Sequence, residues 1–239
     1  MASDPLAGHE TAEPPEAAEA APRDPALAIG ARLAEHRNRR GVKVSALARQ
    51  IGVSPSLISQ IERGQSRPSV STLFALAEAL NVAVDAFFRD GEVAPGLPRP
   101  MVEAPARDGQ RQDRYAVRSH ERARIDIEGG VRWERLTPAP LGDVEFMELI
   151  YAPGAESNPA LYRHPGFEMV LVLSGRLTIF VGFERYDLAA GDSMAFPSTL
   201  PHRYLNPGEE ETRAVTTILR DGLPQSSSAA TGESGSHSA

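Results

Sequence analysis

The chain has 239 residues, a net charge of −7 and no cysteine, so it can form neither a disulfide framework nor a thiolate metal site. It contains no run of about 18 apolar residues and no charged-then-apolar segment after Met1, which argues against a transmembrane helix and a secretion signal. We therefore expect a cytoplasmic protein with no membrane partner. The length allows one large domain or two small ones.

The charge is unevenly distributed along the chain. Residues 1–24 carry one basic and six acidic side chains, residues 25–89 carry nine and four, and residues 90–239 carry 15 and 22. The middle segment is therefore basic, with a net charge of +5, between two acidic segments. Attraction to phosphates depends on the local field more than on the overall charge, so residues 25–89 are a candidate nucleic-acid-binding region.

The first two segments also differ in their apolar pattern. Residues 1–24 consist mainly of Ala, Glu and Pro and bury too little apolar surface to offset their ordering entropy, so we predict a disordered acidic tail. In residues 25–89 apolar side chains recur every three or four positions, between capping residues. This pattern predicts a compact bundle of five short helices. We expect them to begin near Pro25, Val44, Pro55, Val70 and Val84.

The third predicted helix lies within residues 52–64, GVSPSLISQIERG. Ser54 can cap it through its side-chain oxygen, Pro55 suits the first helical position, and Gly64 suits the end. A short helix of this kind, with polar side chains near its N-terminus, has the shape of a DNA recognition helix. An ordinary amphipathic surface helix would fit the same segment, so its neighbours have to decide between the two interpretations.

The two faces of this helix differ in chemistry. The apolar residues at helical spacing, which mark the buried side, are Leu57, Ile58 and Ile61. Ser56, Ser59 and Gln60 point elsewhere, and their hydroxyl and amide groups can hydrogen-bond to base edges.

Residues 25–88 resemble the XRE (Cro-like) class of helix-turn-helix domains, which form a lambda-repressor-like bundle. The resemblance rests on the A-x3-G-V-S turn, the I-E-x-G close and the P-S-x-x-T-L start of the fourth helix, which occur together within LARQIGVSPSLISQIERGQSRPSVSTLFALAEALNV. It implies double-stranded DNA as a partner, with Ser56, Ser59 and Gln60 facing bases. The residues that it implies as phosphate contacts, which position the domain, are Lys43, Ser54, Arg63 and Arg67. Because serines discriminate weakly between bases, we expect a homodimer that reads two half-sites about 34 Å apart.

Beyond the helices the sequence changes to a β pattern. Residues 90–110, rich in Pro and Gly, predict a linker, and the Ser- and Gly-rich residues 223–239 predict a second disordered tail. In residues 111–222 short apolar runs alternate with glycine turns, which predicts a β-sandwich or barrel. The strands are expected at residues 144–152, 168–173, 176–181, 193–196 and 214–219.

One group of residues in this region can do metal or ligand chemistry. Residues 162, 164 and 168 share a face if the segment is extended, and His202, from another strand, can meet them. Two imidazoles and one carboxylate are a competent set for Fe(II), Mn(II), Ni(II) or Zn(II). The candidate metal ligands are therefore His164, Glu168 and His202.

These residues resemble the two cupin motifs, H-x-H-x3-E-x6-G and G-x5-P-x4-H-x3-N, which implies a double-stranded β-helix, or jelly-roll barrel. The matching residues are His164, Glu168 and Gly175 in the first motif and Gly191, Pro197, His202 and Asn206 in the second. Tyr162 replaces the first histidine, so the family's four-ligand metal site is reduced to three, and we favour a metal-free pocket, with a divalent metal ion as the alternative. In both cases we expect a pocket for a small-molecule effector. Its predicted lining is Tyr162, His164, Glu168, His202 and Tyr204.

The order helix-turn-helix, linker, cupin resembles a known architecture of bacterial transcriptional regulators. We therefore expect a sequence-specific DNA-binding regulator, not an enzyme, whose cupin domain senses a small molecule. The main alternative is a metal-dependent cupin enzyme, such as a dioxygenase or isomerase, with an accessory helical domain. A further alternative is an antitoxin-like or scaffolding protein that contacts DNA only for autoregulation.

Overall fold

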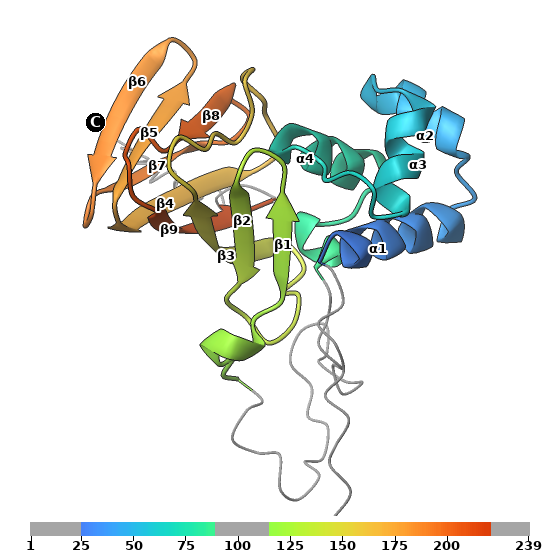
Figure 1. The fold of residues 1–239 in the computed structure, drawn as a ribbon, viewed down its shortest axis with the longest axis horizontal. Helices are drawn as coiled ribbons and strands as arrows, with labels where there is room; N and C mark the ends of the chain where they lie inside the picture. Colours follow the sequence, from blue (N-terminus) through green and yellow to red (C-terminus); the bar gives the residue numbers. More distant parts are fainter. Residues whose placement is uncertain (1–24, 89–114, 221–239) are drawn as a thin grey trace, which may run out of the picture.

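The computed structural model describes residues 25–88 and 115–220 (Figure 1). The predicted tails at residues 1–24 and 223–239 and the predicted linker at residues 90–110 lie outside this part of the chain. The described residues form an all-helical N-terminal region and a C-terminal region of antiparallel sheets. None of the helices in either region is long and apolar enough to cross a bilayer.

The helical region contains four α-helices rather than the predicted five. They are α1 (Pro25–Arg39), α2 (Val44–Ile51), α3 (Pro55–Glu62) and α4 (Val70–Ala79). The fifth predicted helix is a four-residue 3-10 turn, η1 (Val84–Phe87), which Phe88 ends by adopting an extended conformation. This turn is too short to repeat α-helical hydrogen bonds, but Phe87 and Phe88 are still buried.

The helix boundaries follow from local chemistry. The side chain of Ser54 accepts a hydrogen bond from Leu57 N at 3.1 Å, and Pro55 occupies the first turn of α3. Ser69 caps α4 in the same way through Thr72 N. Gly52, with φ of 73°, ends α2 in the left-handed conformation that glycine adopts without strain. These signals are local, which explains why the sequence alone located α2, α3 and α4 closely.

The C-terminal region consists of two antiparallel sheets. One has six strands in the order β1-β2-β3-β9-β4-β7, and the other has three in the order β6-β5-β8. The strands are β1 (Arg124–Ile127), β2 (Val131–Arg135), β3 (Val144–Tyr151), β4 (Phe167–Ser174), β5 (Arg176–Val181), β6 (Glu184–Ala189), β7 (Ser193–Pro197), β8 (His202–Leu205) and β9 (Thr212–Leu219). The five strands expected at specified ranges correspond to β3, β4, β5, β7 and β9.

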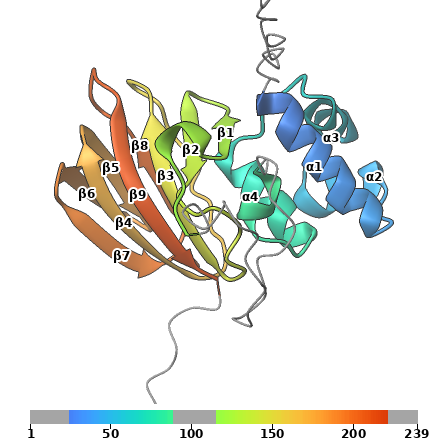
Figure 2. The same ribbon diagram turned by 90° about the horizontal axis from the view of Figure 1, so that it is seen from below.

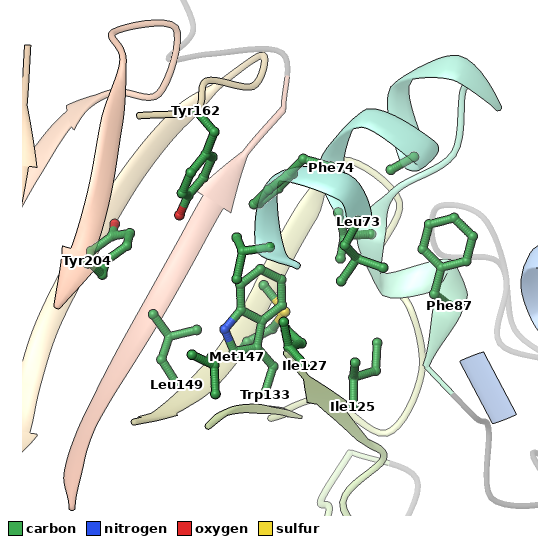
Figure 3. Close-up of a cluster of buried hydrophobic side chains, with 14 of the residues drawn as sticks. Leu73, Phe74, Phe87, Ile125, Ile127, Trp133, Met147, Leu149, Tyr162 and Tyr204 are labelled. Carbon is green, nitrogen blue, oxygen red and sulfur yellow. The ribbon is translucent and has the colours of Figure 1, made fainter. Parts of the chain in front are cut away.

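The helices pack directly on the sheets. Figure 2 shows α1 and α4 beside the hairpin of β1 and β2, and one buried apolar cluster continues from the helices into the sheets. Leu73 and Phe74 of α4 belong to this cluster, as does Trp133 of β2 (Figure 3). Although the sequence separates a helical region from a β region, the two share a hydrophobic core.

Polar contacts also cross this boundary. Val84 N donates to Glu145 Oε1 at 3.0 Å, and Glu128 N donates to Pro68 O at 3.1 Å. The hydroxyl of Ser71 donates to Asn158 Oδ1, also at 3.0 Å. Backbone and side-chain hydrogen bonds therefore fix the orientation of α4 and η1 on the sheets.

Candidate DNA interface and buried histidine cluster

The polar face of α3 is accessible. Ser56 and Gln60 are exposed and Ser59 is half-buried, whereas Ile58 and Ile61 on the opposite face are fully buried. The three polar residues that the sequence singled out therefore lie where a nucleic-acid groove could reach them.

Four further residues were expected to contact phosphates, namely Lys43, Ser54, Arg63 and Arg67. All four are exposed; Lys43 precedes α2, Ser54 precedes α3, and Arg63 and Arg67 follow α3. The guanidinium of Arg63 donates to Gln65 Oε1 at 2.9 Å. Ser54 uses its oxygen to cap α3 but can still donate its hydroxyl hydrogen to a phosphate.

Contacts with α1 hold α3 in place. Arg37 forms an ion pair with Glu62, the last residue of α3, and also donates to Val42 O at 2.9 Å. Gly30 lets the two helices approach closely, because a Cβ atom at this position would lie 2.2 Å from Ile61 O. The polar face of α3 is thus carried on a helix with a rigid support.

The cupin region brings the predicted metal ligands together. His164 precedes β4, Glu168 lies in β4, and His202 begins β8. Glu168 Oε2 lies 3.3 Å from His164 Nε2 and 3.7 Å from His202 Nε2, and all three side chains are buried. We call this group the histidine cluster. It unites a carboxylate and two imidazoles from segments that are far apart in the sequence.

The other atoms of the cluster have protein partners. Glu168 Oε1 accepts hydrogen bonds from the hydroxyl of Tyr204 at 2.7 Å and from Thr216 Oγ1 at 2.9 Å. His202 Nδ1 lies 2.8 Å from Leu200 O, which places the ring proton on Nδ1 and leaves Nε2 as a free acceptor. These hydrogen bonds therefore orient Glu168 and His202, and they leave Nε2 of His202 free to bind a metal ion or to accept a hydrogen bond.

Burial and charge act in opposite directions on the cluster. Burial favours the neutral form of Glu168, but the nearby imidazoles of His164 and His202 and the hydrogen bond from Tyr204 outweigh it and hold the carboxyl pKa below its ordinary value. Burial lowers the pKa of His202, although the Glu168 carboxylate partly opposes this shift. A carboxylate beside a neutral His202 imidazole is the donor set that divalent metals bind.

Tyr162 lies beside the cluster, with its ring centroid 4.6 Å from that of His202. Burial raises the pKa of its hydroxyl well above the ordinary value. Tyr162 therefore stays neutral and is a poor replacement for the histidine of the cupin motif. The structure thus brings together all five residues predicted to line the effector pocket.

Three buried atoms of the cluster have no hydrogen-bond partner in the described part of the chain: His164 Nε2, Glu168 Oε2 and His202 Nε2. Such atoms are costly to bury unless an ion, water or ligand satisfies them. They lie within 4.8 Å of one another and could hold a divalent metal ion. The chemistry of the donors therefore fits a metal.

The space at the edge of the cluster is small. A cavity of about 30 Å³ lies between α4 and the sheets, and of the five predicted effector residues only His164 lines it. The other lining residues include Phe74, Glu145 and Arg220. This cavity has room for a water molecule or an ion but not for a metabolite.

Sequence reasoning did not identify two residues of the site. Thr216 supports Glu168 from β9, a segment for which the sequence predicted only a strand. Phe74 of α4 stacks on His164, with ring centroids 3.9 Å apart and an interplanar angle of 6°. Its place in the apolar stripe of a helix gave no signal of a contact with the cupin region.

Asn206, the last residue of the second cupin motif, has a structural role. Its amide nitrogen donates hydrogen bonds to backbone carbonyls, including Tyr151 O and Glu210 O.

Comparison with known proteins agrees with both regions. Residues 33–87 match the helix-turn-helix family model HTH_3, and residues 147–218 match the cupin domain model Cupin_2. The HTH-type transcriptional regulator SutR of Escherichia coli K12 is 29% identical over 179 residues, which cover 74% of this chain and 86% of SutR. The HTH-type transcriptional regulator PuuR of the same organism is 26% identical over 183 residues, which cover 77% of this chain and 90% of PuuR.

A solved structure shares the fold across both regions. The crystal structure of an HTH_3 family transcriptional regulator from Vibrio cholerae superposes with a TM-score of 0.56 and 22% identity, covering 84% of this chain and 97% of that one. The chain thus contains a region that matches the helix-turn-helix model and a region that matches the cupin model, and SutR and PuuR, which it resembles over both regions, are transcriptional regulators.

Proposed function

We propose that this protein is a sequence-specific DNA-binding regulator that works in the cytoplasm as a homodimer, and that its cupin domain senses a small molecule. The observation that carries the proposal is the exposed polar face of α3, on a helix that is capped by Ser54 and supported by α1. Ser56, Ser59 and Gln60 would contact bases. The residues proposed to contact phosphates are Lys43, Ser54, Arg63 and Arg67.

A selection from a random duplex library, followed by anisotropy titrations, tests DNA binding. Gln60→Ala should relax the sequence preference, because it removes a side chain that can bind adenine through two hydrogen bonds. Arg67→Ala should weaken binding to all duplexes and reduce its salt dependence. Arg185→Ala is the charge-matched control, since Arg185 lies on β6, away from the helices (Figure 1). Equal binding to selected and scrambled duplexes would refute sequence-specific recognition.

The sensing role rests on the histidine cluster. We infer that the two sheets form the double-stranded β-helix of cupins, and that an effector approaches the side chains of Tyr162, His164, Glu168, His202 and Tyr204. The three unsatisfied donor atoms support occupation by a divalent metal, by a polar effector group, or by both. If the effector bound two conformations of the protein with different affinities, it would shift the equilibrium between them. The coupling free energy between effector binding and DNA binding would then be about 1–3 kcal/mol.

The domains are proposed at residues 25–89 for DNA binding and 111–222 for sensing. In a dimer, a change in the relative placement of two helix-turn-helix domains would alter the spacing between half-sites. A mismatch of a few ångströms prevents simultaneous docking in two successive major grooves about 34 Å apart. Effector binding would therefore change the affinity for an operator without any contact between effector and DNA.

A further inference from the structure

The contact between Phe74 and His164 joins the two domains at the histidine cluster. The two rings are almost parallel, and Phe74 also lies 5.8 Å from Tyr162 and 5.7 Å from Trp133, measured between ring centroids. Figure 3 shows Phe74 projecting from α4 toward Tyr162. A helix of the DNA-binding domain thus supplies an aromatic side chain to the sensing site.

This side chain restricts the space at the cluster. Phe74 is 8% exposed and lines the cavity of about 30 Å³ that His164 also lines. A metabolite needs a pocket of several hundred cubic ångströms, which is roughly ten times this volume. An effector larger than an ion could therefore reach His164 from the α4 side only if the Phe74 ring moved away.

Movement of Phe74 would involve its whole domain. Leu73 and Leu76 of α4, and Leu80 directly after it, are fully or almost fully buried, and α4 packs on α2, which in turn packs on α3. Close-packed interiors transmit displacement because they cannot absorb it locally. A shift of α4 away from the sheets would therefore carry the recognition helix with it.

We propose that α4 is a lid over the histidine cluster, with Phe74 as its plug, and that an effector displaces this plug and so repositions the helix-turn-helix domain. The inference rests on the proposed function and specifies the element that couples the two sites. A metal ion could occupy the cluster with the lid closed, whereas a metabolite requires the lid to open.

Carbethoxylation of histidine by diethylpyrocarbonate, measured by peptide mass spectrometry on the full chain, tests the lid without DNA. His120, which is 78% exposed at its side chain, calibrates the reagent within each sample. In the wild type His164 should react far more slowly than His120. Phe74→Ala should accelerate modification of His164 by about tenfold or more, because a protected group reacts only through local opening.

Leu73→Ala is the matched control. It truncates the neighbouring buried side chain of α4 but leaves the stacking of Phe74 on His164 in place. Phe74→Leu provides a second variant that retains most of the volume but removes the stacked ring. Equal acceleration in Leu73→Ala and Phe74→Ala would mean general loosening and would overturn the proposal. Rapid modification of His164 in the wild type would also overturn it.

A reversible crosslink tests whether α4 itself must move. The chain has no cysteine, so Ser71→Cys with Asn158→Cys offers a single possible intramolecular disulfide, at a position where the native side-chain oxygens lie 3.0 Å apart. Once mass spectrometry confirms the disulfide, the oxidised form should modify His164 more slowly than the reduced form of the same protein. Equal rates would refute lid opening by α4.

Coupling to DNA is read separately. The affinity of Phe74→Ala for the selected duplex should differ from that of the wild type by about fivefold or more, whereas Leu73→Ala should change it less. If His164 became accessible in Phe74→Ala but the affinity for DNA did not change, displacement of Phe74 would not reposition the helix-turn-helix domain, and this part of the proposal would be refuted. If neither the wild type nor any variant binds duplex DNA, the proposed regulatory function fails. The modification rates of His164 then still decide whether α4 is a lid.

Discussion

The guanidinium of Arg135 on β2 lies 3.3 Å from the carboxylate of Asp85 in η1, and both side chains are almost completely buried. Arg135 also donates to Thr137 O at 3.2 Å. The ion pair joins the last turn of the helical domain to the sheet of the cupin domain. Charged groups buried in this way need their partners, so the pair constrains how the two domains fit together.

Removal of one partner of this pair should destabilise the protein strongly. Arg135→Met leaves the Asp85 carboxylate buried without this cation, and we expect a loss of about 3–5 kcal/mol in the free energy of unfolding. The double variant Arg135→Met/Asp85→Ala should recover much of the loss, because neither charge of the pair is then left buried without its partner. Urea titrations followed by circular dichroism measure both values. A loss below about 1 kcal/mol in the single variant would contradict a structural role for the pair.

Glu145 makes the stability of the domain boundary dependent on pH. Burial raises the pKa of its carboxyl from 4.5 to about 7, although the hydrogen bond from Val84 N opposes this shift. Further charges that act on it come from His164, Asp85 and Arg220. The unfolded chain therefore ionises Glu145 near pH 4.5, while the folded protein retains the proton up to about pH 7.

The stabilisation from protonated Glu145 is complete below about pH 4.5 and is lost as the pH rises through about 7, with a maximum of about 3 kcal/mol. Glu145→Gln cannot ionise and keeps an acceptor for Val84 N. Relative to the wild type, the variant should gain stability as the pH rises over this range. Thermal unfolding of both proteins across the range measures the difference. Parallel pH profiles would show that Glu145 does not titrate between the two states.

Gly30 provides a test in which helix propensity and packing predict opposite signs. On propensity alone, Gly30→Ala in α1 would stabilise the protein by up to about 1 kcal/mol. The new Cβ atom would lie 2.2 Å from Ile61 O and 2.6 Å from Glu62 O, both of which are backbone atoms of α3. We therefore expect a net loss of about 1–3 kcal/mol, together with weaker DNA binding as α3 shifts.

Chemical denaturation gives the stability of Gly30→Ala, and the anisotropy assay gives its affinity for the duplex. Ala31→Gly at the neighbouring exposed position is the control. It should cost up to about 1 kcal/mol through propensity but leave DNA affinity unchanged. Increased stability of Gly30→Ala would contradict the close approach of α1 and α3.

Local signals made much of the fold predictable. The caps at Ser54 and Ser69 and the glycine at position 52 define helix ends through interactions within a few residues. The motif spacing likewise located His164, Glu168 and His202, because period-two alternation and the resemblance to cupins agree on these positions. Where the chemistry is local or the spacing is fixed, the sequence was sufficient.

The features that escaped prediction depend on tertiary context. The first four side chains of β6, from Glu184 to Asp187, are exposed on both faces, so no apolar alternation marks this strand. Phe74 has an ordinary position in the apolar stripe of α4, and only the docking of the helix on the sheets brings it to His164. The coupling between domains therefore could not be inferred from the periodicity of either one.

The outer face of the six-stranded sheet offers a surface for the proposed homodimer. Leu171 and Leu173 on β4 are 42% and 48% exposed, and Phe146 on β3 is 37% exposed. Phe146 and Met169 are both paired with Thr217 of β9, and Leu171 is paired with Val215, so these residues form neighbouring rows. An apolar strip on a sheet face is typical of an interaction surface, and a second copy of the chain is the occupant that binding to two half-sites requires.

Leu171→Lys should convert the dimer into a monomer, because a second copy would bury the introduced charge without a partner. It should also weaken binding to a duplex with two half-sites while changing binding to a single half-site little. Leu200→Lys, at a similarly exposed leucine in the turn after β7, is the control and should remain dimeric. Sedimentation velocity measures the state of association. A monomeric wild type, or a dimeric Leu171→Lys, would refute dimerisation through this strip.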